Sequence, residues 1–447
     1  MFSKVLIANR GEIAVRVIRA CRELGVASVA IYSEADRQAM HVRRADEAFE
    51  CGPAPALESY LAAERVVELA GRAGADAIHP GYGFLSENGD FADLCAQRGI
   101  AFIGPSGDVI RAMGDKLSAR AILEQAGVAV VPGTREPLVD ADAVAAARTL
   151  GFPVMVKASA GGGGRGLRLA ADESALLKAL PRARSEAQRA FGDDTLYLEK
   201  ALERPRHIEV QVLADRAGRA VHLFERECSI QRRHQKLVEE APALGLDPAT
   251  RAALGEAALA ATRAIGYAGA GTCEFLLDAS GAFYFLEMNT RIQVEHPITE
   301  EITGVDLVQA MIRIAAGEPL PLDPAALAIR GHAIELRIYA EDPEKGFLPA
   351  PGQVAELRPP GGPGIRLDAG VEAGDAVSIH YDPLLAKLIA WGADRPEAIE
   401  RLERALAELR IEGLRTTLPF HRWLVRHAAF RAGEIDTGFV DAHWPGR

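Results

Sequence analysis

Cysteine is scarce in this chain, whose 447 residues include only five. Their number is odd and their spacing matches no common metal-binding pattern, so the sequence indicates neither a disulfide framework nor a zinc site. Few, unpaired cysteines are typical of proteins from reducing compartments. We therefore expect a cytoplasmic protein. The five are Cys21, Cys51, Cys95, Cys228 and Cys273.

Long apolar runs and an excess of positive charge are also lacking. No apolar stretch approaches the roughly 20 residues that a membrane-spanning helix needs. The strand-like run Val5–Ala8 starts so early that we expect no signal peptide. The formal net charge is −11, whereas nucleic-acid binding needs clustered positive charge. The sequence therefore argues against a membrane protein and against nucleic acid as the main partner.

What the chain does contain is the composition of a globular protein, with 49% hydrophobic and 25% charged residues. A chain of this length exceeds a single hydrophobic core and suggests roughly two to four domains. Residues 1–112 alternate strand and helix patterns, as at Val5–Ala8, Ile13–Glu23 and Ala27–Tyr32. Such alternation predicts an α/β domain with a doubly wound parallel sheet, in which ligands bind at the carboxyl ends of the strands.

The second predicted unit covers residues 113–316 and begins with a helix over 113–130. A compact subunit over about 131–204 contains the strands Pro153–Lys157 and Leu167–Ala170 on either side of a glycine run. A strand, a glycine loop and a returning strand form a hairpin that can fold over a nucleotide as a mobile lid. We therefore expect α/β and α+β architecture in this chain.

The remaining residues, 331–447, follow the proline-rich segment Gly317–Pro324, which is the predicted linker. They alternate short strands and turns and then continue into a helix with apolar Ile399, Leu402, Leu406 and Leu409. This pattern predicts a C-terminal mixed β domain.

The densest polar stretch is Glu287–His296, which directly follows the strand-like run Ala282–Leu286. It holds two carboxylates, an arginine, an asparagine and a glutamine. A further carboxylate, Glu274, ends the small apolar segment Gly269–Cys273. Carboxylates on adjacent strands can hold Mg²⁺ against phosphate oxygens. The sequence thus indicates an enzyme that handles a nucleoside triphosphate.

Several nearby motifs admit two interpretations. In the run Ala160–Gly166, the backbone N–H groups can approach and bind phosphate oxygens, because glycine has no Cβ to obstruct them. The run lacks the P-loop pattern, however, and can also be a plain flexible loop. Lys157 can reach a ligand from its strand end or face solvent, and a lysine placed like Lys116 is more often on the surface. Glu199 and Lys200 can form a hinge that hydrogen-bonds a base edge, or an ordinary charge pair.

A basic run, Arg226–Lys236, is followed at once by the acidic segment Glu239–Pro242. A solvated face is the usual interpretation of such a run, but the adjacent carboxylates indicate an arranged network. His207, His234 and His296 lack the paired spacing of metal ligands, so a structural role is expected for each.

Taken in order, these motifs resemble those of the biotin carboxylase family within the ATP-grasp superfamily. They extend from residue 4 to about residue 440, so the resemblance covers nearly the whole chain. One segment, Cys51–Tyr60, is more similar to the α chains of acyl-CoA carboxylases than to the free acetyl-CoA carboxylase subunit. The motifs are Lys4–Ala14, His79–Asn88, Met113–Lys116, Lys157–Gly166, Glu227–Lys236, Glu287–His296 and Asp436–Phe439.

The resemblance implies an N-terminal biotin carboxylase domain (1–112), an ATP-grasp domain (113–316) with its lid (about 131–204), and a C-terminal biotin carboxylase domain (331–447). The implied reaction is ATP-dependent carboxylation of biotin, the first half-reaction of an acetyl- or acyl-CoA carboxylase. ATP phosphorylates bicarbonate to carboxyphosphate, which breaks down to CO₂ and phosphate. The phosphate removes the N1′ proton of biotin, and the enolate attacks CO₂ in a site that must exclude water.

The resemblance also implies residue roles. Glu295 would be the base for bicarbonate, Lys236 would hold the γ-phosphate, and Arg337 would stabilise the biotin enolate. Glu274, Glu287 and Asn289 would hold Mg²⁺ or Mn²⁺. The nucleotide would contact Lys116, Lys157, Gly161, Gly162, Gly163, Gly164, Gly166, Glu199, Lys200, Leu202, His207, Gln231 and His234. Bicarbonate and biotin would contact Arg16, Tyr82, Lys236, Arg291, Gln293, Val294, Glu295 and Arg337.

Parts of the complete reaction are missing from this sequence. It contains no Met-Lys pair, the biotin attachment motif of carrier domains. Biotin would therefore be a carried substrate brought by a biotin carboxyl carrier protein or domain, and a carboxyltransferase subunit would complete the reaction. Arg19 and Glu23 lie four residues apart on one predicted helix face and match dimer contacts of the family, so a homodimer is expected.

Two other classes are compatible with some of these motifs. Another ATP-grasp carboxylate–amine ligase would share Lys157, Glu274 and Glu287, but it would not need the set Arg291, Gln293 and Glu295. A non-catalytic nucleotide-binding module would be favoured by a missing lysine or carboxylate, and none is missing. If residues 291–295 are extended, the side chains of that set point to one side.

Overall fold

The N-terminal part of the protein is built on a parallel sheet. The computed structural model describes residues 1–160, 167–320 and 322–446. Its first sheet has the order β3-β2-β1-β4-β5, and every pair in it is parallel, as the sequence predicts. Its elements are β1 (Lys4–Ile7), α1 (Gly11–Glu23), β2 (Ala27–Ser33), α2 (Met40–Arg44), β3 (Glu47–Gly52), α3 (Ala63–Ala73), β4 (Ala77–His79), α4 (Gly89–Gln97), β5 (Ala101–Phe102) and α5 (Gly107–Gly114).

The loops after β1 and β4 meet at the carboxyl edge of this sheet. The Asn9 side chain donates to the backbone carbonyls of Pro80, at 2.7 Å, and Tyr82, at 2.8 Å. Helix α1 then packs Ile13 and Val17 into the core beside Ile7 of β1. This packing fixes where the first turn of α1, which carries Glu12, lies relative to the rest of the molecule.

The helix predicted over residues 113–130 is two helices. Helix α5 ends at Gly114 and α6 spans Lys116–Gln125. The break occurs at Asp115, whose backbone is extended and whose side chain accepts a hydrogen bond from the Ser118 N–H at 2.7 Å. Such a side-chain cap starts a new helix, so Lys116 lies at a helix N-terminus and the prediction of one continuous helix is wrong.

The subunit expected over residues 131–204 has a sheet and a hydrophobic core of its own. Its three strands have the order β7-β6-β8, and β6 and β7 form the predicted antiparallel hairpin. Val154, Leu176 and Leu198 belong to one buried cluster within it. The predicted glycines Gly161, Gly162, Gly163, Gly164 and Gly166 lie outside the described residues. The elements are α7 (Ala143–Leu150), β6 (Val154–Ala158), β7 (Arg168–Ala170), α8 (Glu173–Phe191) and β8 (Leu196–Lys200).

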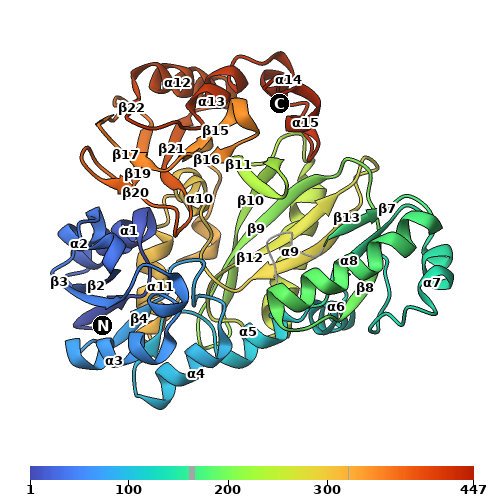
Figure 1. The fold of residues 1–447 in the computed structure, drawn as a ribbon, viewed down its shortest axis with the longest axis horizontal. Helices are drawn as coiled ribbons and strands as arrows, with labels where there is room; N and C mark the ends of the chain where they lie inside the picture. The colour runs from blue at the N-terminus through green and yellow to red at the C-terminus, as the bar shows by residue number, and fades with distance from the viewer. Residues whose placement is uncertain (161–166, 321, 447) are drawn as a thin grey trace.

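An eight-stranded antiparallel sheet forms the centre of the molecule, in the order β13-β12-β9-β10-β11-β14-β21-β19. It joins the central residues to the C-terminal residues because β11 pairs with β14. The N-terminal sheet, the three-stranded subunit and the C-terminal helices lie around it (Figure 1). Its strands are β9 (Arg206–Ala214), β10 (Ala220–Arg232), β11 (Gln235–Ala241), β12 (Gly269–Leu277), β13 (Phe283–Asn289), β14 (His332–Tyr339), β19 (Ile365–Ala369) and β21 (Leu384–Gly392).

Helices and short strand pairs complete the central and C-terminal parts. The predicted C-terminal helix is α12, and Ile399, Leu402 and Leu406 are buried on it as expected. The remaining helices are α9 (Pro248–Ala264), α10 (His296–Thr303), α11 (Leu307–Ala315), α12 (Arg395–Glu408), α13 (Leu418–Leu424), α14 (Ala428–Ala432) and α15 (Phe439–His443). The short pairs are β15 (Glu341–Asp342) with β16 (Leu348–Pro349), β17 (Gly352–Gln353) with β20 (Ala376–Val377), and β18 (Glu356–Arg358) with β22 (Arg410–Glu412).

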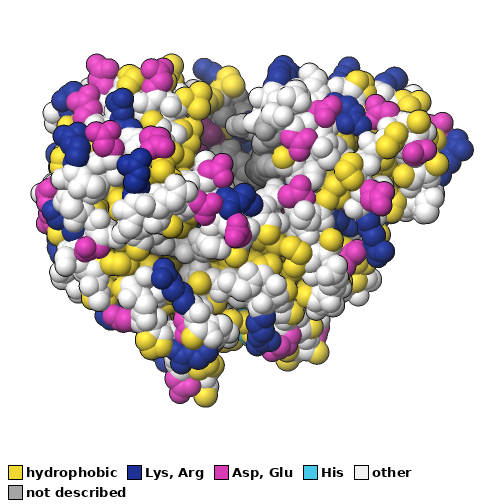
Figure 2. All heavy atoms as spheres, turned by 90° about the horizontal axis from the view of Figure 1, so that it is seen from below, with side chains coloured by type: hydrophobic (Ala, Val, Ile, Leu, Met, Phe, Trp, Pro, Cys, Tyr) yellow, Lys and Arg dark blue, Asp and Glu magenta, His cyan; other side chains and the backbone are white. Residues whose placement is uncertain are grey.

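Charged side chains of both signs are scattered over one face of the molecule (Figure 2). On the face shown in Figure 2, lysine and arginine side chains intermingle with aspartate and glutamate side chains. Across the described residues, no helix is both long enough and apolar enough to cross a membrane.

Candidate active site

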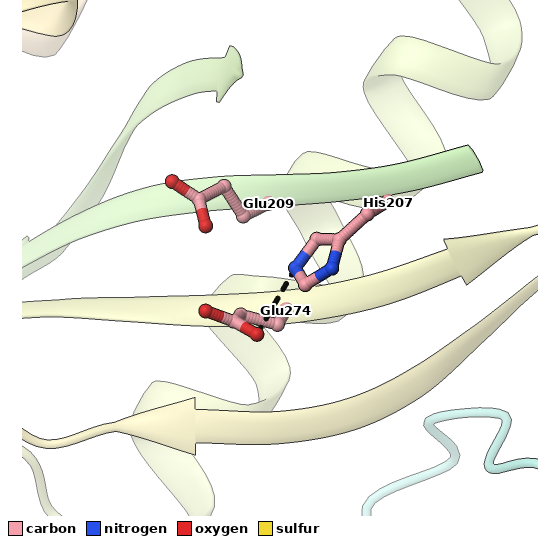
Figure 3. A group of neighbouring side chains, drawn as sticks. All are labelled: His207, Glu209 and Glu274. Carbon is pink, nitrogen blue, oxygen red and sulfur yellow. Dashed lines mark ion pairs between the residues drawn. The ribbon is translucent and has the colours of Figure 1, made fainter. Parts of the chain in front are cut away.

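The site is built on one face of the central sheet. On β9 the polar residues His207, Glu209 and Gln211 alternate with apolar neighbours, so their side chains share a face. Glu274 of β12 is the register partner of Glu209. His207 and Glu274 form an ion pair with Nε2 and Oε2 3.0 Å apart, and Glu209 points to the same side (Figure 3). A buried polar row of this kind needs partners from neighbouring strands.

Lys236 of β11, two strands away from β9, supplies one shared partner for this row. Its Nζ lies 2.5 Å from Glu209, 2.9 Å from Glu274 and 2.7 Å from Glu295. Burial disfavours the ammonium ion, but the three carboxylates outweigh that cost and raise the pKa of Lys236 well above its usual value. Lys236 therefore stays charged throughout the physiological range.

Arg226 forms a second centre that the sequence did not identify as a site residue. Its side chain is fully buried, and its Nε donates to Glu209 at 2.5 Å. One of its Nη groups donates to Gln293 Oε1 at 2.7 Å, while Gln293 Nε2 donates to Glu274 at 2.7 Å. The amide of Gln293 is thus held from both ends. The alternation of polar and apolar residues on β9 was the signal that could have revealed the burial of this network.

The proposed base, Glu295, lies between two cations. One of its carboxylate oxygens accepts from Lys236, and the other accepts from Arg337 Nη2 at 3.1 Å. Burial raises the pKa of Glu295, but Lys236, Arg337 and Arg226 outweigh it and hold that pKa well below the usual value. Glu295 is therefore an ionised carboxylate with two fixed positive charges beside it.

Arg337 also binds a second carboxylate. Its Nε donates to Glu239 at 2.5 Å, and its Nη1 lies 3.4 Å from the Tyr339 hydroxyl. Burial raises the pKa of Glu239 to about 7, against the opposing effect of Arg337. Arg337 is thereby fixed in place at the junction of β11 and β14.

The condition that residues 291–295 are extended fails at the end of this segment. Glu295 precedes α10 with φ of −81° and ψ of 8°, which is a turn. Arg291 instead donates to Glu87 at 2.9 Å and to Asn289 at 2.8 Å, whereas Gln293 and Glu295 face the buried network. The turn, and not period-two alternation, brings Glu295 to Lys236.

The predicted metal ligands lie on two neighbouring strands. Glu274 and Glu287 are register partners on β12 and β13, so their expected adjacency is confirmed, although Glu274 lies within its strand and not at the end. The Asn289 side chain donates to Glu274 at 2.9 Å, and Glu287 lies 3.4 Å from Lys116. Carboxylate and amide oxygens from adjacent strands fit the ligand preference of Mg²⁺.

The residues predicted to contact phosphates and base are split between the lid subunit and the sheet. Lys157 is buried and lies 2.7 Å from Glu199, which also binds Arg120 at 2.7 Å, so a solvent-facing lysine is excluded. Lys200 donates to the backbone carbonyls of Gly151 and Phe152.

Three further residues predicted to contact the nucleotide lie near this subunit. Leu202 lies half-buried between β8 and β9, and Gln231 is buried near the end of β10. His234 follows in the turn before β11. Burial lowers the pKa of His234, and the charges of Lys157 and His207 lower it further, so His234 lies within electrostatic reach of both.

The remaining predicted residues border the N-terminal sheet. The Tyr82 hydroxyl donates to Glu12 of α1. Arg16 binds Glu300 of α10 at 2.9 Å and Asp306 at 2.7 Å. The backbone carbonyl of Val294 accepts from Lys387 at 2.8 Å. His296 is buried with its Nδ1 2.8 Å from the Gln293 carbonyl, which fits the structural role expected for it.

Comparisons with known proteins match three stretches of the chain. Residues 1–110 match the family model "Biotin carboxylase, N-terminal domain", residues 115–323 match "Carbamoyl-phosphate synthase L chain, ATP binding domain", and residues 335–442 match "Biotin carboxylase C-terminal domain". The chain is 53% identical to a biotin carboxylase of Nostoc sp., over 98% of each protein. It is 52% identical to the α subunit of rat mitochondrial methylcrotonoyl-CoA carboxylase, of which it spans 62%.

A solved structure has the same fold. The biotin carboxylase domain dimer of Hydrogenobacter thermophilus 2-oxoglutarate carboxylase, in complex with MgADP, ADP and bicarbonate, superposes with a TM-score of 0.96 at 50% identity. The match covers 99% of this chain and 98% of that one. This chain therefore belongs to the biotin carboxylase family.

Proposed function

We propose that this chain catalyses the ATP-dependent carboxylation of biotin with bicarbonate, giving carboxybiotin, ADP and phosphate. The observation that carries this proposal is the position of Glu295 between Lys236 and Arg337. A carboxylate held ionised can accept the proton of bicarbonate, and the two cations can stabilise the anions that follow.

The first step is the attack of bicarbonate on the γ-phosphorus of ATP. Glu295 takes the remaining proton of bicarbonate, while Gln293 and Arg291 orient it. Lys236 stabilises the negative charge that accumulates as carboxyphosphate forms and ADP leaves. Fixed charges in a site shielded from water act strongly, because no solvent has to reorganise around them.

The second step transfers carbon to biotin. Carboxyphosphate breaks down to CO₂ and phosphate, the phosphate takes the N1′ proton of biotin, and the enolate attacks CO₂. Arg337 stabilises the enolate oxygen, and Tyr82 and Arg16 border the biotin and phosphate region. Arg337 is preorganised for this role because Glu239 and Glu295 hold its guanidinium in place.

The nucleotide binds between the lid subunit and the central sheet. Glu274, Glu287 and Asn289 would hold Mg²⁺, which supplies positive charge to the phosphates. Lys116 and Lys157 neutralise further phosphate charge, with His207, Gln231 and His234 near the nucleotide. Glu199, Lys200 and Leu202 frame the adenine. The proposed phosphate cover, at Gly161–Gly164 and Gly166, lies outside the described residues.

The proposed boundaries are an N-terminal domain of residues 1–112, an ATP-grasp domain of 113–316 with its lid at about 131–204, and a C-terminal domain of 331–447. Biotin arrives on a carrier protein or domain, and a carboxyltransferase completes the reaction of an acetyl- or acyl-CoA carboxylase. The protein acts in the cytoplasm as a homodimer. The dimeric state is supported by the dimer of the Hydrogenobacter thermophilus domain.

One assay tests this proposal against the alternatives. ATP hydrolysis is measured with bicarbonate, with and without free biotin. Biotin-stimulated hydrolysis is expected. Hydrolysis that responds only to an added amine and carboxylate would instead indicate a carboxylate–amine ligase, and nucleotide binding without hydrolysis would indicate a binding module.

A further inference from the structure

One buried lysine in the C-terminal part of the sheet has no role in the reaction described above. Lys387 lies on β21, and its side chain has no exposed surface. An ammonium ion in such a place is very unfavourable unless ionic or hydrogen-bonding partners compensate for its lost hydration. Lys387 Nζ lies 3.1 Å from Glu12 Oε2 and donates to the Val294 carbonyl at 2.8 Å.

The contact with Val294 acts directly on the proposed base. A peptide unit is planar, so the carbonyl of Val294 and the N–H of Glu295 turn together. Holding that carbonyl at 2.8 Å therefore fixes the peptide from which Glu295 extends. Glu295 has turn backbone directly before α10, and its own carbonyl accepts from the Ile298 N–H at 3.3 Å, so the Lys387 contact holds the peptide on the other side of Glu295.

The contact with Glu12 acts on the opposite side of the site. Glu12 lies in the first turn of α1 and is buried, and its other oxygen accepts from the Tyr82 hydroxyl. Tyr82 belongs to the loop after β4, which Asn9 also holds. One carboxylate thus links Lys387 to the N-terminal loops that border the proposed biotin region.

Lys387 also belongs to the charged face that surrounds Arg337. It is the register partner of Arg337 on β14 and of Asp368 on β19. Asp368 is itself bound by Arg366 at 2.7 Å, whereas Lys387 forms its ion pair with Glu12. Glu335 shares this face of β14, since it lies two residues from Arg337.

We propose that Lys387 is a positioning residue for the carboxylation, which orients the Val294–Glu295 peptide for bicarbonate and holds Tyr82 through Glu12. This inference rests on the proposed function. Lys387 touches no substrate in it. It connects the bicarbonate side and the biotin side of the site through one buried charge.

The test compares Lys387→Met with the wild type. The substitution keeps a long unbranched side chain, one atom shorter than that of lysine, and removes its charge. We expect the KM for bicarbonate to rise and biotin-dependent kcat to fall, each by about tenfold or more, because small misplacements of reacting groups cost up to about 10²-fold. The KM for ATP should change less than twofold, since the proposed nucleotide contacts lie on other strands.

Two further variants separate positioning from general stability. Arg395→Met removes another buried cation of the same part of the molecule, one that binds Glu240 and the carbonyls of Phe430 and Arg431. Arg395→Met should lower the melting temperature, while the KM for bicarbonate and the KM for ATP stay unchanged. Glu12→Gln breaks the other half of the link without removing Lys387. It should raise the KM for biotin and leave the bicarbonate-dependent hydrolysis of ATP without biotin intact.

The outcomes separate the proposed function from the positioning role of Lys387. Wild-type protein without biotin-stimulated hydrolysis would overturn the proposed function itself. The positioning role would be overturned if the wild type is active and Lys387→Met loses only thermal stability. An equal rise of the KM values for ATP and for bicarbonate in this variant would overturn it as well. If Lys387→Met does not fold, an unchanged KM for biotin in Glu12→Gln overturns it.

Discussion

Lys236 is the side chain that binds three buried carboxylates of the site, those of Glu209, Glu274 and Glu295. Lys236→Ala should lower biotin-dependent turnover by about 10²–10³, the usual effect of removing one preorganised charge donor. ATP binding should fall only modestly, because Lys236 binds Glu295 on the bicarbonate side of the site and is not among the proposed contacts of the adenine. Steady-state kinetics and calorimetric titration with ATP measure the two effects. Turnover close to that of the wild type would contradict the assignment.

Glu295 permits a sharper test, because a base and a structural partner predict different kinetics. As a base, Glu295→Gln should lower kcat severely even at saturating bicarbonate. As a mere partner of Lys236 and Arg337, it should lower the melting temperature or weaken bicarbonate binding, while kcat recovers at high bicarbonate. Measuring kcat at high bicarbonate together with the melting temperature decides between them, and full recovery of kcat would remove Glu295 from the catalytic residues.

At the level of whole strands and helices, Glu240 joins β11 to β14 and α12. It accepts from Arg395 at 2.6 Å and lies 2.8 Å from His332. Although burial raises the pKa of Glu240, His332 and Arg395 outweigh it and lower that pKa from 4.5 to about 2. The folded state thus binds this proton less tightly than the unfolded state does, so Glu240 stabilises the fold above pH 4.5.

That stability should be lost as the pH falls from 4.5 to 2. Glu240→Gln should be less stable than the wild type at pH 7 and should show a weaker dependence of the free energy of unfolding on pH in this window. Urea titrations at a series of pH values measure both. Parallel curves for the variant and the wild type would exclude this contribution of Glu240.

The hairpin of β6 and β7 gives another prediction for an individual element. The subunit that contains it has its own core, so it can move as a body against the central sheet. Nucleotide binding should close it over the phosphates. Backbone amides of β6 and β7 should then exchange hydrogen more slowly with ATP than without it, as mass spectrometry can measure. Equal exchange in the two states would mean that this hairpin is not a lid.

Much of the fold was predictable because its patterns are local. Strand and helix periodicity in the first 112 residues predicts the parallel sheet, which the structure confirms. Strand β3 was missed, since Glu47–Gly52 is a partly polar edge strand without clear alternation. The break between α5 and α6 was missed because it depends on one capping aspartate.

The site was only partly predictable, because its contacts join residues that are distant in the sequence. Motifs indicated Lys236, Glu274 and Glu295, but Arg226 meets Gln293 across 67 residues through strand register. Lys387 reaches Val294 across 93 residues. Neither register nor the turn at Glu295 is encoded in the spacing of a local motif, so these partners require the structure.

At the scale of the whole molecule, the central and C-terminal parts are held together by a sheet that crosses the predicted linker. Strand β11 pairs with β14, and one hydrophobic cluster combines Ile230 and Val238 with Ile334 and Leu402. The C-terminal part therefore shares its core with the central part. Separated from it, the C-terminal part would expose the open edge of β14 and the apolar surface of that cluster, which favours aggregation.

We therefore expect residues 331–447 expressed alone to lack cooperative unfolding, although the linker before them suggests an independent domain. Co-expression with residues 1–330 should restore a folded complex, because β11 and β14 can then pair and the buried bond between Glu240 and His332 can form. Near-UV circular dichroism and thermal unfolding of each preparation measure this. As a control, a fragment of residues 131–204 should retain more structure when expressed alone than residues 331–447 do. The hydrophobic core of that subunit comes from its own strands and helices. A sharp, reversible unfolding transition for residues 331–447 alone would show that the shared sheet is not needed for this part to fold.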